Sequence, residues 1–207
     1  MGDKLVGIIT GDVVNSREGD PDRWQHQLKS VLNKHGKRPS EWEIFRGDSF
    51  QLEVVPAISL VTAIEIKAAI KEDEYLVDVR MALGIGRQEH KSDRITDSNG
   101  EAYTHSGHCF EELKKRRLAI KTPWSDFDEE WNLYLRLASL TMDDWKPKTA
   151  IIFREALLHP QETQIELAKR LGKTQSTISE SLSRAGYNEI ESMLAKFQRD
   201  ILERITQ

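Results

Sequence analysis

Two aspartates, each preceded by a glycine, are the first residues of this chain whose type and spacing could support chemistry. Asp12 follows the apolar run "KLVGIITG", and Asp48 lies in "FRGDSFQ", between two short segments that read as strands. Gly47 suits a two-residue hairpin turn, but such a turn has no need of a carboxylate. Mg²⁺ or Mn²⁺ that carries a nucleotide is commonly bound to the protein by one or two carboxylates, and two carboxylates on rigid strands could fill this role. Asp12 and Asp48 are therefore candidate metal ligands, and the alternative is that both only complete turns.

The elements that must position these aspartates can be predicted from the hydrophobic pattern. Segment 4–14 predicts a buried strand, and segment 20–36 predicts a helix that opens with Asp-Pro and ends in glycine. The hairpin follows, then a helix opened by Pro56, then alternating apolar residues over 77–85 that predict another strand. Strand, helix, hairpin, helix, strand is the order of a ferredoxin-like or polymerase-palm domain. We predict an α+β fold, with an antiparallel sheet and helices on one face.

The rest of the chain is predicted to be helical. After a short helix and a strand that ends at Pro123, apolar residues recur at helical spacing up to the C-terminal residues. We therefore predict a palm-like domain over residues 1–124 and an all-α domain over residues 125–207. Its last helix carries an apolar stripe from Ile190 to Ile205, which either packs on its own domain or forms a dimer contact.

Segment 162–185 has the most specific pattern in the sequence. A short amphipathic helix, a turn containing Gly172 and a second helix capped by Thr174 or Gln175 make a helix-turn-helix. In such a unit the second helix reads bases, glutamine pairing with adenine, and nearby cations contact phosphates. The candidate DNA-binding residues are Lys169, Arg170, Lys173, Thr174, Gln175, Ser176, Thr177 and Arg184. A helical bundle that never meets DNA is the alternative, and Glu180 favours it.

The charge distribution limits where nucleic acid can bind. The chain has a net charge of −4; residues 1–145 carry 20 basic against 26 acidic residues, a net of −6, and residues 146–207 carry 10 against 8, a net of +2. This excludes a nucleic-acid coat protein and assigns any DNA contact to the C-terminal third. A module with so little positive charge binds weakly, so we expect a homodimer that reads two half-sites.

Composition also indicates the compartment. Cys109 is the single cysteine, which excludes an internal disulfide and fits a reducing environment. The apolar run from Leu5 to Ile9 is too short for a signal peptide or a membrane span. We expect a cytoplasmic protein that makes no membrane contact.

Several motifs resemble a known family. "IITGDVVNS", "FRGDSFQ", "VRMALGIG" and "SNGEAYTHSG", followed by the helix-turn-helix, resemble the SatD family over nearly the whole chain. The first three are also similar to the metal-binding strand, Gly-Asp hairpin and central strand of class III nucleotidyl cyclases. Related palm domains occur in GGDEF-type diguanylate cyclases. The resemblance implies a palm fold in which Asp12 and Asp48 hold Mg²⁺ or Mn²⁺.

The sequence departs from the cyclase pattern after the central strand. Cyclases have an Asn and an Arg on the next helix, and the matching positions, counted from Gly100, are Thr104 and His108. Neither supplies an amide or a permanent guanidinium, although preorganised charge is a large catalytic term. Binding a nucleotide without turnover is thus favoured over cyclisation.

Four residues are the candidates for contact with a nucleotide. The loop after the strand 77–85 carries three cations, and we expect it to lie past the same sheet edge as the aspartates. The candidates are Arg87, Lys91, Arg94 and His108. Plain solvent-facing surface is the alternative. Arg80, on the strand itself, is expected to pair across the sheet with Asp78 or Glu53.

Two hypotheses of function follow. The favoured one is a DNA-binding transcription regulator whose palm-like domain senses a nucleotide with its metal. The rival is a metal-dependent nucleotidyl cyclase or nucleotidyltransferase that uses Asp12 and Asp48 and is targeted by the helix-turn-helix. A scaffold with neither activity is a third alternative.

Overall fold

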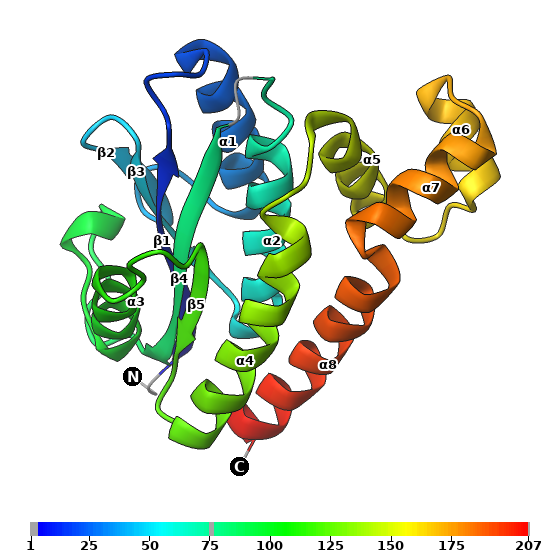
Figure 1. The fold of residues 1–207 in the computed structure, drawn as a ribbon. Coiled ribbons are helices and arrows are strands. Elements are labelled where there is room, and N and C mark those ends of the chain that lie inside the picture. Colours follow the sequence, from blue (N-terminus) through cyan, green and yellow to red (C-terminus); the bar gives the residue numbers. More distant parts are fainter. Residues whose placement is uncertain (1–3, 75–76, 207) are drawn as a thin grey trace.

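A five-stranded sheet forms the centre of the first half of the chain in the computed structural model, which describes residues 4–74 and 77–206 (Figure 1). The strands are β1 (Leu5–Val14), β2 (Trp42–Phe45), β3 (Ser49–Val54), β4 (Asp78–Arg87) and β5 (Leu118–Lys121). Their order across the sheet is β2-β3-β1-β4-β5. Strands β1 to β4 pair with one another only in antiparallel fashion and have the ferredoxin-like order.

Three helices cover this sheet. They are α1 (Pro21–His35), α2 (Ser59–Ile70), which follows a short 3₁₀ turn at Pro56–Ile58, and α3 (Glu101–Glu111); a second 3₁₀ turn spans Ile95–Asp97. Asp20 caps the start of α1, as its place before Pro21 predicts: Asp20 Oδ1 accepts a hydrogen bond of 3.0 Å from the Asp22 amide. We call the strands and these three helices the sheet region.

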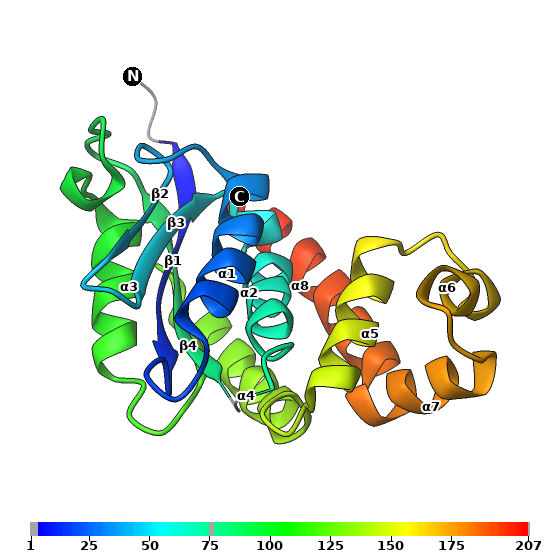
Figure 2. The ribbon, with the colours of Figure 1, turned by 90° about the horizontal axis from the view of Figure 1, so that it is seen from above.

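The α+β class is confirmed, and two details of the sheet differ from the expectation. The sheet is mixed, because β5 follows the crossover helix α3 and pairs in parallel with β4. In addition, α3 lies on the face opposite α1 and α2 (Figures 1 and 2). Gly84 permits this close packing, since a Cβ there would lie 2.2 Å from the Ala102 carbonyl oxygen.

Five helices make up the remainder, which we call the helical region. They are α4 (Ser125–Met142), α5 (Pro147–Leu158), α6 (Gln164–Leu171), α7 (Gln175–Ala185) and α8 (Tyr187–Thr206). Among the described helices, none has the length and apolar character that a membrane span requires.

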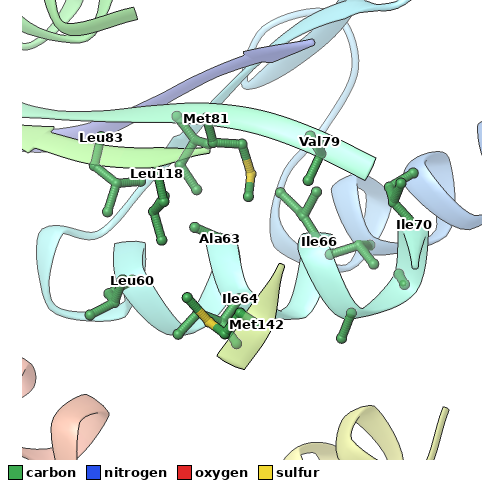
Figure 3. Close-up of a cluster of buried hydrophobic side chains, with 14 of the residues drawn as sticks. Leu60, Ala63, Ile64, Ile66, Ile70, Val79, Met81, Leu83, Leu118 and Met142 are labelled. Carbon is green, nitrogen blue, oxygen red and sulfur yellow. The ribbon is translucent and has the colours of Figure 1, made fainter. Parts of the chain in front are cut away.

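The main hydrophobic core passes through both regions. Helix α2 lies between the sheet and the helical region, and its side chains meet Met81 and Leu118 from the sheet and Met142 from α4 (Figure 3). This position explains why α2 is apolar around most of its circumference. The expected boundary near residue 124 therefore marks the end of the sheet, while the core continues across it.

The terminal helix packs on its own chain. Phe197 and Ile201 of α8 are fully buried in the main core, and Phe197 meets Trp131 of α4 edge to face at 4.9 Å. Of the two alternatives for this stripe, packing on its own domain is the one observed.

Candidate DNA-binding surface and carboxylate site

The helix-turn-helix begins with two well-defined helix caps. Thr163 caps α6 in a reciprocal capping box with Glu166, and Gly172 ends α6 with φ at 62°, in the left-handed region. Thr174 caps α7, its Oγ1 accepting a hydrogen bond of 3.2 Å from the Thr177 amide. The predicted pair of helices around Gly172 is confirmed, and Thr174 rather than Gln175 is the cap.

A separate small core holds this unit together. Its buried residues come from three helices, so α5 is the first helix of the unit, a role that the sequence pattern alone did not indicate. The members are Ile152, Ala156, Leu167, Ala168, Ile178 and Leu182. Because this cluster is distinct from the main core, the outer sides of α6 and α7 stand away from the sheet region (Figure 2).

Most of the predicted DNA-contacting residues are exposed on one side of this unit. Thr174, Gln175, Ser176 and Thr177 form the exposed first turn of α7. Lys169 and Lys173 are also exposed, and in the described part of the chain neither forms an ion pair. Arg184 lies 3.7 Å from Glu180, an exposed pair of little strength. These cations are available to an external anion.

Arg170 differs from the other candidates because it is fully engaged within the chain. Its Nε lies 3.1 and 3.0 Å from the two carboxylate oxygens of Glu162, and its Nη1 contacts Glu155 on α5. The hydrogen bonds that Arg170 donates to these two carboxylates raise its pKa. The side chain therefore fastens α6 to α5, which leaves it poorly placed for the phosphate contact that we expected.

Gln164 is a residue of this surface that was missed in the sequence. The amide of Gln175, at the start of α7, donates a hydrogen bond of 2.9 Å to Oε1 of Gln164, at the start of α6. The link holds the side chain that we expect to meet adenine. A glutamine at the first position of both helices was the available signal.

The two aspartates of the expected metal site lie at the same end of the sheet. Asp12 of β1 pairs in register with Ser49 of β3, and the carbonyl oxygen of Asp48 accepts a hydrogen bond of 3.1 Å from the Val13 amide. Ser16 Oγ donates to Asp48 Oδ2 at 2.8 Å. The β2–β3 loop has three residues rather than two, since Phe45 pairs with Ser49.

Arg80 occupies the space beside these carboxylates. It pairs with Asp12 directly across β1 and β4, its Nε donating to Asp12 Oδ1 at 2.9 Å and its Nη2 to Oδ2. The guanidinium lies 5.4 Å from the ring centre of Phe110 on α3. Hydrogen bonds to Asp12, helped by the charge of Asp48, raise the pKa of Arg80.

Arg80 does not pair with Asp78 or Glu53 as expected, because the strand register places it opposite Asp12. Asp78 is instead bound to Lys67, at 2.9 Å from Asp78 Oδ1, and Glu53 to Lys91. Position 80 faces Asp12 because β4 runs antiparallel to β1 over ten paired residues. The hydrophobic pattern does not show which residues face each other when two paired strands are far apart in sequence.

This arrangement does not fit a resident divalent ion. A metal between Asp12 and Asp48 needs free carboxylate oxygens, and both oxygens of Asp12 accept hydrogen bonds from a permanent cation. Within the described ranges, no group of three or more His, Cys, Asp or Glu residues is placed to hold a metal. The Mg²⁺ or Mn²⁺ expectation thus requires Arg80 to leave Asp12.

The loop cations lie at the other end of the sheet. Arg87 pairs with Leu5 at the start of β1, whereas Asp12 pairs with Arg80. Positions 80 and 87 are seven residue steps apart along β4, a distance of about 24 Å at ~3.4 Å per residue. The expectation of one shared edge is wrong, because the antiparallel course of β4 carries its end away from Asp12.

Two of these cations are also bound to carboxylates. Lys91 lies 3.1 Å from Glu53 on β3, and the Arg94 guanidinium holds Glu43 on β2 at 2.7 Å. The hydrogen bond from Arg94 holds the pKa of Glu43 below its ordinary value. These pairs fasten the loop to the sheet.

His108 belongs to a third location. It is exposed on α3 and lines a pocket of about 590 Å³ between α3, β5 and α4, together with Arg116, Lys121 and Arg136. Thr104, the other position compared with the cyclases, hydrogen-bonds the Gly100 carbonyl at 3.3 Å within its own helix. The four nucleotide candidates and the two aspartates therefore do not form one site.

The fold and these surfaces define an α+β protein whose helical region contains a helix-turn-helix. No model of a known protein family matches the chain, and no curated protein sequence matches it. The resemblance to the SatD family stays a prediction, and the functional argument depends on the geometry.

Proposed function

We propose that this protein is a DNA-binding transcription regulator that reads DNA with α7. The carrying observation is the exposed first turn of α7, flanked by Lys169 and Lys173, for which the described residues supply no counter-ion. Helix N-termini and unpaired lysines both attract phosphate oxygens. Glutamine and hydroxyl side chains in that turn match the hydrogen-bonding groups of the major groove.

The proposal includes a homodimer in the cytoplasm. One helix-turn-helix of low charge needs a second copy to reach a useful affinity. Because α8 uses its apolar stripe internally, the contact must lie elsewhere. Helix α4 exposes Leu133, Leu137 and Leu140 along one side, and these side chains are 46%, 55% and 73% exposed. A leucine row of this kind is unusual on a surface that stays in water.

The sheet region has the regulatory part in this proposal, with a nucleotide as the ligand to be tested. The nucleotide would bring Mg²⁺ or Mn²⁺ only if Arg80 left Asp12. The cyclase or nucleotidyltransferase alternative needs two free metal-binding carboxylates, and it gains no support from an Asp12 held by Arg80.

Selection from a random pool of DNA duplexes tests the central claim. The full chain is incubated with the pool at low salt, and the bound sequences are read and then measured by fluorescence anisotropy. We expect a recurrent, inverted-repeat sequence whose affinity falls steeply as salt rises. Lys173→Ala should weaken binding to every sequence, and Lys115→Ala, at an exposed lysine after α3, is the matched control. Failure to retain any duplex at low salt would refute the proposal.

A further inference from the structure

At the end of the sheet near Asp12, the cation Arg80 lies beside two acids, Asp12 and Asp48. Asp12 and Asp48 bring two negative charges to this end, and the Arg80 guanidinium is the positive group beside them. Arg80 is held from several directions: by both oxygens of Asp12, by the ring of Phe110 and by its place within the paired part of β4. The side chain is 32% exposed and that of Asp12 is 20% exposed, so both are partly shielded from water.

A guanidinium competes well with a metal ion in such a place. Its planar fork matches the two oxygens of a carboxylate, and it stays charged at any pH that a folded protein meets. A divalent ion would have to displace this cation, or bind next to it against its repulsion. Asp48 then supplies only one carboxylate, and one of its oxygens, Oδ2, also accepts a hydrogen bond from Ser16.

We propose that Arg80 is the resident cation of this site, in the place that a divalent metal would take beside Asp12 and Asp48. The protein as it stands then binds no Mg²⁺ or Mn²⁺ there. The site is a latent metal site, and removing the Arg80 side chain exposes it.

Mn²⁺ binding to purified full-length variants tests this inference. The concentration of free Mn²⁺ is measured by electron paramagnetic resonance during a titration, with no nucleotide present. We expect no saturable binding to wild type and one new site in Arg80→Ala, with an affinity about tenfold or more above the background. The added substitution Asp12→Asn should abolish that site. Arg136→Ala removes one positive charge on α4 and is the control for a general change in net charge.

Two results would overturn the inference. The first is saturable Mn²⁺ binding to wild type that equals that of Arg80→Ala and is lost in Asp12→Asn alone. The second is an Arg80→Ala protein that is folded by circular dichroism but gains no site. If Arg80→Ala does not fold, Arg80→Gln keeps a shorter polar side chain at this position without the charge, and the same titration applies. A DNA-binding assay of the same variants is read separately, because the inference does not depend on DNA recognition.

Discussion

The sheet region and the helix-turn-helix differ in where their cations find counter-ions. In the sheet region Arg80, Lys91 and Arg94 each lie against a carboxylate on a neighbouring strand. In the helix-turn-helix Lys169 and Lys173 are exposed, and the described residues offer them no ion pair. The comparison teaches that a basic side chain indicates a ligand surface only where the fold leaves it without a partner. Residue type alone made both sets look alike.

The most buried cation of the sheet region gives the strongest test of this difference. Lys67 on α2 is 1% exposed and lies 2.9 Å from Asp78 and 2.7 Å from Asp143, at the end of α4. Lys67→Met should lower the free energy of unfolding by about 3 kcal/mol, because it leaves the buried Asp78 carboxylate without this partner. Lys173→Met should change it very little. Urea denaturation of both variants checks this, and equal stability losses would break the comparison.

The same cluster predicts a pH dependence. Burial opposes the charge of the Asp78 carboxyl, but Lys67 and Lys71 outweigh it and hold the Asp78 pKa below its ordinary value of 3.8. A depressed folded-state pKa stabilises the protein above 3.8 and stops doing so as the pH falls through the lower folded value. Wild type should therefore lose stability with acid more steeply than Asp78→Asn. Parallel acid profiles of the two proteins would show that Asp78 is not part of this linkage.

The third prediction concerns recognition within the helix-turn-helix. Gln175→Ala should cost about 1–3 kcal/mol of discrimination at one base position, expected to be adenine. Gln164→Ala should relax the same position by a smaller amount, because Gln164 only holds the Gln175 amide. Base preferences of both variants can be read from duplex selection. A Gln164→Ala preference identical to wild type would remove the positioning role and leave DNA binding itself untouched.

The elements could be predicted from the sequence because their signals are local. Asp20 and Pro21 begin α1, and Thr163 with Gly172 brackets α6, each within a few residues of the boundary that it sets. Even the helix on the second face had a signal, since Gly84 and Gly86 in "LGIG" leave room for α3. Helix caps depend on neighbours in sequence, whereas the two glycines of β4 indicate a close approach without naming the element that approaches.

The composition of the sites could not be predicted in the same way. Asp12 and Arg80 are 68 residues apart in sequence and meet only through the register of β1 and β4. The direction of β4 likewise decides that Arg87 lies far from Asp12. A one-residue change of register would move each side chain to the other face of the sheet. Long-range register is therefore the information that the sequence pattern lacked.

The smallest expected effect distinguishes Arg170, on α6, from Lys173, in the turn that follows α6. Lys173→Ala should reduce the slope of log affinity against log salt by about 0.9, the value for one lost phosphate contact, and leave stability unchanged. Arg170→Ala should leave the slope unchanged and lower stability only slightly, since its pairs with Glu162 and Glu155 are on the surface. Anisotropy titrations at several salt concentrations and thermal melts measure the two quantities. The opposite assignment, with Arg170 changing the slope, would mean that DNA draws this side chain away from its internal partners, and an internal counter-ion would then be a poor guide to which cations bind.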